Sequence, residues 1–66
     1  MDLINCKIGI LLEDFGLSRR IAKLLRQDGA IVHCAVNDEE MENLLDNLDL
    51  DIAIVGKPQP ELLYLN

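Results

Sequence analysis

Three short apolar segments, separated by two stretches with a helical period, constrain the fold of this chain more than any other feature. The segments are residues 7–12, 30–36 and 51–55, and each is rich in Ile, Val, Leu or Ala. Nearly continuous apolar runs of this length are typical of strands buried on both faces, as in a parallel sheet. The sequence therefore predicts one strand in each segment.

The stretches between these segments have the period of amphipathic helices. From Ser18 to Gln27 the apolar residues recur at i, i+3 and i+4, and Gly29 follows where helices commonly end. Its apolar face holds Leu17, Ile21, Ala22, Leu24 and Leu25, and its polar face holds Arg19, Arg20, Lys23, Arg26 and Gln27. A second helix is predicted after Asn37, because Glu40 stands in the capping-box position. The apolar stripe of this second helix is Met41, Leu44, Leu45 and Leu48.

The order strand, helix, strand, helix, strand predicts an α/β fold with right-handed crossovers and a parallel sheet. In the flavodoxin-like arrangement the three strands lie in the spatial order 2-1-3. The 66 residues suffice for a single small domain, residues 1–66. Gly56-Lys57-Pro58-Gln59-Pro60 ends the third strand, since proline cannot join a central ladder. For residues 61–66, one helical turn and a disordered end both stay open.

The charge of the chain excludes several classes of partner. Twelve acidic residues against six basic ones give a formal net charge of -6, which repels nucleic acid and anionic membranes. Phe15 and Tyr64 are the only aromatic residues, so a platform for stacking bases is missing. No apolar run approaches the roughly 20 residues of a membrane-spanning helix, and Met1-Asp2 is unlike the start of a signal peptide. We therefore expect a cytoplasmic protein.

Side chains suited to metal binding or catalysis are few and badly spaced. Cys6 and Cys34 fall near opposite ends of neighbouring parallel strands, roughly 15 Å apart at about 3.3 Å per residue, so we expect no disulfide. His33 and Cys34 are adjacent and point to opposite faces of a strand. The chain also lacks a glycine-rich phosphate loop. We expect neither an enzyme nor a resident metal or cofactor, and a switch using Glu13, Asp14 or Cys34 is the weakest alternative.

The joint spacing of these features resembles that of response-regulator receiver domains, over residues 6–62 and the first half of such a domain. Glu13 and Asp14 stand where a receiver has its acidic pair, and Arg19 where its first helix often has a basic residue. Further similarity is carried by residues 29–35, Asn37, Glu40, residues 51–55 and Pro60. The chain is thus identified as a truncated, degenerate receiver, or pseudo-receiver.

Two departures from the receiver pattern bear on its chemistry. Gly56 stands where the family has the aspartate that takes a phosphoryl group from a histidine kinase, and glycine has no nucleophile. The last two strands of a receiver, which carry a Ser/Thr and a Lys at the phosphoryl group, are not in this sequence. The resemblance leaves Mg²⁺ only Glu13 and Asp14, which bind it weakly without further anions. We therefore expect no phosphorylation at the usual position.

The resemblance also implies a docking surface, because receivers bind kinase and phosphotransfer helices through helix one and the strand-exit loops. The corresponding residues here are Phe15, Arg19, Arg20 and Lys23. The expected function is a non-enzymatic module of two-component signal transduction, which binds a histidine kinase, phosphotransfer or regulator domain without phosphorylation. The alternative is an excised structural fragment of a larger sensor kinase or transcription regulator.

The third strand raises a separate expectation about self-association. Without a fourth strand beside it, Ile52, Ala53, Ile54 and Val55 would form an apolar edge with unpaired backbone groups. Domains below roughly 70–80 residues also gain little stability from one core, which favours partner subunits. The sequence therefore predicts a homodimer that pairs through this edge about a twofold axis.

Overall fold

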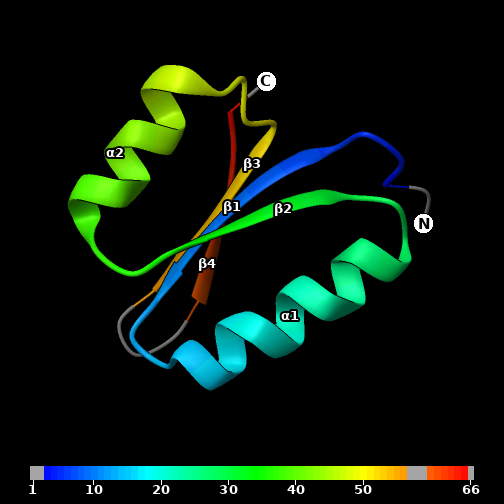
Figure 1. Ribbon diagram of the computed structural model, residues 1–66, viewed down its shortest axis with the longest axis horizontal. Coiled ribbons are helices and arrows are strands. Elements are labelled where there is room, and N and C mark those ends of the chain that lie inside the picture. The colour runs from blue at the N-terminus through cyan, green and yellow to red at the C-terminus, as the bar shows by residue number, and fades with distance from the viewer. Residues whose placement is uncertain (1–2, 57–59, 66) are drawn as a thin grey trace.

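The computed structural model describes residues 3–56 and 60–65, without the side chains of residues 60 and 61. Its elements are β1 (Lys7–Leu12), α1 (Phe15–Gln27), β2 (Ile31–Ala35), α2 (Asp38–Asn47), β3 (Ile52–Gly56) and β4 (Pro60–Tyr64). The described strands form one sheet in the order β2-β1-β3-β4, and α1 and α2 lie on opposite sides of it (Figure 1). The expectations about Met1-Asp2 and the Lys57-Pro58-Gln59 break fall outside the described residues.

The first three strands confirm the predicted α/β class and the order 2-1-3. β1 pairs in parallel with β2 on one side and with β3 on the other, so that Ile8 lies opposite both Val32 and Ile52. The chain moves from β1 to β2 and then crosses back past β1 to β3. Because both crossovers have the same hand, the two helices cover opposite faces of the sheet.

β4 corrects the expectation for the third strand. Residues 60–64 pair antiparallel with β3, with Leu62 opposite Ile54 and Tyr64 opposite Ile52, so the sheet is mixed and not wholly parallel. β3 is therefore an interior strand, and the predicted dimer edge at Ile52, Ala53, Ile54 and Val55 is wrong. The β3–β4 hairpin satisfies within the chain the backbone groups that an edge would offer to a second copy. Pro60 begins the outer strand, where proline is tolerated.

The core on the α1 side depends on small helix residues. Ser18 and Ala22 are at most 2% exposed, and Ala22 packs with Ile8 and Ile10 of β1. Small side chains let the helix approach the sheet closely, so the contact face centres on these two positions. Leu24, expected on the apolar face, is consequently turned outward and is 63% exposed.

The core on the α2 side is smaller and contains Ala35, Met41 and Leu50. Gly9 of β1 makes room for it, because a Cβ at Gly9 would lie 2.8 Å from Leu50 Cδ1 and 3.4 Å from Met41 Sδ. Because Gly9 has no side chain, α2 can pack closely against the centre of the sheet. The chain thus divides its apolar residues between two thin cores, one on each face.

The end of α1 and the start of α2 follow the predicted signals. Asn37 Oδ1 accepts a hydrogen bond of 2.8 Å from the Glu40 N–H, which confirms Asn37 as the N-cap of α2. The Glu40 side chain reaches back as in a capping box, but its Oε1 accepts a bond of 3.0 Å from the N–H of Val36, one residue before the cap. Gly29 has a φ of 96°, which confirms the left-handed residue predicted after α1. Cys6 and Cys34 are both free, as the register of their strands requires.

Candidate functional site

The carboxyl ends of β1, β2 and β3 meet at one edge of the sheet, and several predicted site residues lie there. Leu12 is opposite Gly56 in the ladder, so Glu13 follows directly beyond the level of Gly56. Gly56 also lines a shallow hollow with Asp38 and Val55. The structure therefore brings the acidic end of β1 to the same edge as Gly56, the residue that the receiver resemblance predicts at the phosphoacceptor position.

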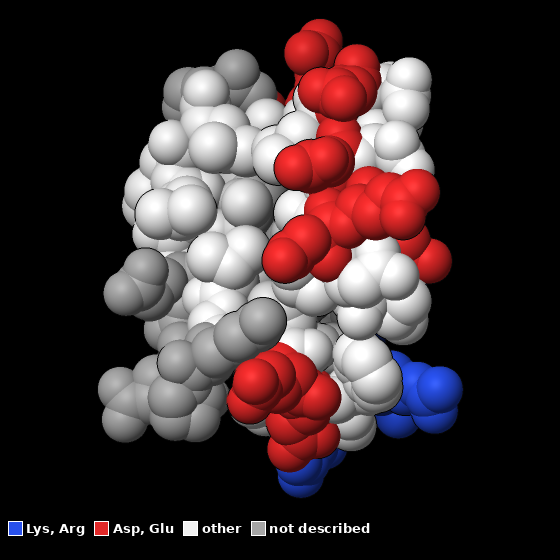
Figure 2. All heavy atoms as spheres, turned by 90° about the vertical axis from the view of Figure 1, so that its left-hand side faces the viewer, with Lys and Arg blue, Asp and Glu red and all other residues white. Residues whose placement is uncertain are grey.

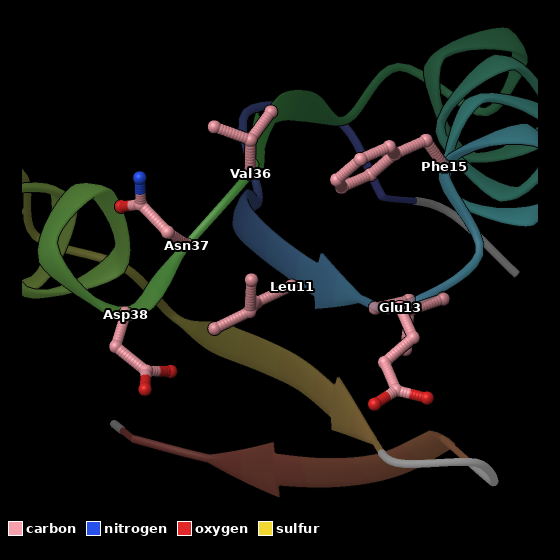
Figure 3. Close-up of a pocket in the computed structure, with 7 residues that line it drawn as sticks. Leu11, Glu13, Phe15, Val36, Asn37 and Asp38 are labelled. Carbon is pink, nitrogen blue, oxygen red and sulfur yellow. The ribbon is translucent and has the colours of Figure 1, made fainter.

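A second hollow at this edge, of about 300 Å³, lies between the loop after β1 and the loop after β2. We call it the docking hollow; its lining residues are Leu11, Leu12, Glu13, Phe15, Val36, Asn37 and Asp38. Phe15 and Val36 are 48% and 53% exposed, and Phe15 points into the space between the two loops (Figure 3). The carboxylates of Glu13 and Asp38 lie on the side of β3 (Figure 3). The hollow thus combines accessible apolar side chains with an acidic border.

Glu13 and Asp14 have different roles although the sequence pairs them. Asp14 is the N-cap of α1, and its Oδ1 accepts a hydrogen bond of 3.1 Å from the Leu17 N–H. This bond satisfies an otherwise unpaired helix donor and explains why α1 begins at Phe15, three residues before the predicted Ser18. Glu13 is exposed beside it. Over residues 3–56 and 60–65, no group of three or more His, Cys, Asp or Glu is arranged to hold a metal ion.

The predicted docking residues on α1 divide into two pairs. Phe15 and Arg19 line a further hollow of about 280 Å³ together with Cys34 and Val36 of the β2 end. Arg20 and Lys23 are exposed on α1 but line none of the hollows described here. The sequence reasoning missed Val36, whose signal is its place as the last apolar residue before a capped helix. Val36 follows the last residue of β2, so its side chain is exposed where the strand ends.

The two helices carry opposite charge on opposite faces of the sheet. α1 contains four basic residues and no acidic one, whereas α2 contains five acidic residues and no basic one. The basic residues are Arg19, Arg20, Lys23 and Arg26, and the acidic ones are Asp38, Glu39, Glu40, Glu42 and Asp46. On the face that α2 covers, acidic side chains form a band, and basic side chains appear only at its rim (Figure 2). The helix on one face of the sheet is therefore basic, and the helix on the other face is acidic.

Comparison with known proteins identifies no relative, since no protein-family model, curated protein or solved structure matches the chain. Among the helices of the described residues, none combines the length and the apolar content needed to cross a membrane.

Proposed function

We propose that this chain is a non-enzymatic signalling module of the receiver-like, flavodoxin-like type, which binds a protein partner through the docking hollow without being phosphorylated. The observation that carries the proposal is the joint exposure of Phe15 and Val36 at the edge where parallel strands end. Ligands of open α/β sheets bind outside the carboxyl ends of the strands. An exposed aromatic anchor beside an apolar hollow also fits the way protein interfaces concentrate their binding energy.

The chemistry available at this edge supports binding and not group transfer. Gly56 offers no side chain to accept a phosphoryl group, and Asp14 is engaged as a helix cap. Glu13 by itself is a poor Mg²⁺ ligand set, because this ion keeps most of its waters without several anionic partners. These residues therefore favour a module that signals through contact.

The shape and charge of the docking hollow suit a partner helix. An apolar face of such a helix would cover Phe15 and Val36, and acidic residues at its border would meet Arg19 on the adjoining α1 surface. In receivers, kinase and phosphotransfer helices dock in this region, so we propose a histidine-kinase or phosphotransfer domain as the partner class. In this view Arg20 and Lys23 contribute to electrostatic attraction.

Titration calorimetry against purified kinase dimerisation and phosphotransfer domains from the source organism tests the proposal. We expect at least one domain to bind, and Phe15→Ala to weaken it by about tenfold or more, because buried aromatic anchors contribute at least about 1–2 kcal/mol. The matched control is Leu24→Ala, which removes an exposed apolar side chain of α1 away from the hollow. Incubation with acetyl phosphate should add no phosphoryl group by mass spectrometry.

Two results would contradict this function. The first is that wild type, Phe15→Ala and the double variant Arg19→Glu plus Lys23→Glu bind the partner domain with equal affinity. The second is a stable acyl phosphate on the chain. The alternative function, a structural piece of a larger signalling protein, predicts instead that the isolated chain does not fold cooperatively.

We also propose that the chain forms a homodimer. The two copies pair through the outer strand β4 and not through β3. Leu62, Leu63 and Tyr64 of this outer strand are 44–70% exposed, so they present an apolar edge. Proteins rarely leave such an edge bare, and antiparallel pairing of two β4 strands about a twofold axis would cover it.

A further inference from the structure

β2 is the other outer strand of the sheet, and its free side carries a short row of open backbone groups. The Ile31 N–H donates to the Cys6 carbonyl, 2.8 Å away, at the start of β1. Alternate residues of a strand direct their backbone groups to opposite sides, so Ile31 and its alternate neighbours face β1 while Val32 and Cys34 face outward. Within the described residues, the Val32 N–H and both backbone groups of Cys34 have no hydrogen-bond partner.

Two side chains of opposite charge border this open row. Arg26 of α1 donates a hydrogen bond of 2.7 Å to the Val32 carbonyl. Glu40 of α2 accepts one of 3.0 Å from the Val36 N–H, at the other end of β2. Side chains therefore occupy the Val32 carbonyl and the Val36 N–H, and both backbone groups of Cys34 are open between these two positions.

Two hollows adjoin the open row, and Cys34 lines both. The hollow of about 280 Å³ near Phe15 is lined by Arg19 and by Ser18, whose buried Oγ has no hydrogen-bond partner. The other, of about 530 Å³, opens toward α2; its lining residues are Arg26, Val32, His33, Cys34, Glu40, Asn43 and Leu44. The first hollow thus has the basic Arg19 in its wall, and the second has the acidic Glu40 on its α2 side and the basic Arg26 on its α1 side.

We propose that the β2 edge binds an extended segment of another protein, which adds a strand to the sheet and carries alternating acidic and basic side chains. Successive side chains of an added strand point to opposite faces. Acidic ones would lie on the α1 side, near Arg19, and basic ones on the α2 side, near Glu40. The surface adjoins the docking hollow, because Phe15 and Val36 line both that hollow and the one of about 280 Å³. The open backbone groups of Val32 and Cys34 belong to residues that do not line the docking hollow, so this proposal does not depend on the proposed function.

The polarity of the molecule disfavours a second copy as the occupant. A twofold axis that joins two β2 strands antiparallel in one sheet is perpendicular to that sheet, so the two α1 helices share a face. The basic residues of one α1 would then approach those of the other, and the acidic α2 helices would meet likewise. Like charges across an interface suppress such pairing, whereas an alternating segment meets both faces with opposite charge.

The test uses the 66-residue chain and a fluorescent peptide of about eight residues with strictly alternating Glu and Lys, which is an ordinary strand length. We expect saturable binding by fluorescence anisotropy, with amide chemical-shift changes centred on Val32 and Cys34. A peptide of the same composition, with all Glu in one half and all Lys in the other, should bind at least about tenfold more weakly. Binding should also weaken with salt, because the contacts are exposed ion pairs.

Cys34→Pro removes an outward N–H without removing a bond to β1, and Cys34→Ala is its matched control. We expect the proline variant to lose about tenfold in affinity and the alanine variant to keep it. Arg19→Glu should weaken binding, whereas Arg20→Glu, the same charge change away from the hollows, should not. Equal affinity for both peptides, shifts centred on β4, or self-association of the chain through β2 in sedimentation would overturn the proposal.

Discussion

The carboxylate of Asp51 accepts a hydrogen bond of 2.9 Å from the backbone N–H of Lys7, which joins the beginnings of β3 and β1. The backbone of Asp51 adds two bonds, from its N–H to the Lys7 carbonyl at 2.8 Å and from the Leu65 N–H to its carbonyl at 3.0 Å. One residue thus fixes the start of the central strand, the start of its neighbour and the end of the β4 hairpin.

Replacing Asp51 should therefore destabilise the whole sheet. We expect Asp51→Ala to lower the free energy of unfolding by about 1.5–3 kcal/mol, the usual effect of losing a hydrogen bond to a charged group. Urea unfolding followed by circular dichroism measures it. Asp49→Ala, at a neighbouring exposed aspartate, should change stability by less than about 0.5 kcal/mol. Similar losses in both variants would contradict the role of the Asp51 carboxylate.

Asp14 and Glu13 should respond differently to the same substitution. Asp14→Ala removes the cap of α1, so we expect a loss of about 1 kcal/mol in unfolding free energy. Glu13→Ala removes an exposed carboxylate and so changes the net charge equally, but it should leave the free energy of unfolding nearly unchanged. Asp14→Asn should retain most of the stability, because asparagine also caps helices well. A larger loss for Glu13→Ala than for Asp14→Ala would show that the cap is unimportant.

Ser18 should be a site where a smaller, apolar side chain stabilises the protein. Its Oγ is buried without a hydrogen-bond partner in the described part of the chain, and the helix favours alanine. We expect Ser18→Ala to raise the free energy of unfolding by about 1 kcal/mol, within the range of the penalty for an unpaired buried hydroxyl. Ser18→Thr keeps the hydroxyl, adds a methyl group to a tight contact and should destabilise. Thermal melts that place the alanine variant below wild type would refute this interpretation.

Cooperative unfolding separates an autonomous module from a structural fragment. Two small cores and a closed β3–β4 hairpin lead us to expect one sigmoidal melt of the 66-residue chain, with a stability of about 3–5 kcal/mol. Circular dichroism and scanning calorimetry should agree on the transition, as two-state unfolding requires. A gradual, aggregating loss of signal would favour the fragment.

The oligomeric state tests the proposed pairing of β4. We expect wild type to behave as a dimer in size-exclusion chromatography with light scattering at micromolar concentration. Leu62→Lys combined with Tyr64→Lys should give a folded monomer, because charged side chains block edge-to-edge pairing. Leu24→Lys introduces one positive charge at an exposed leucine on α1, away from β4, and should leave the dimer intact. A folded wild-type monomer would end the proposal.

Local signals in the sequence predicted the parts of the fold that depend on neighbouring residues. Asn37 with Glu40 marked the start of α2, and Gly29 marked the end of α1, because capping bonds and a left-handed backbone are formed within a few residues. The apolar segments predicted the parallel strands, since short crossovers allow few topologies, and the order of the strands was taken from the flavodoxin-like arrangement. Phe15, in contrast, was proposed as a docking residue only through the receiver resemblance.

Long-range packing decided the rest. Residues 61–64 carry too short a pattern to distinguish a strand from a helical turn, and β4 exists because β3 offers it a free edge. Leu24 faces outward because Ser18 and Ala22, as small residues, set how close α1 lies to the sheet. The sequence by itself determined the first five elements and the charges of the two helices. Only the tertiary structure decided which edges stay open, because backbone pairing joins segments that are distant in the chain.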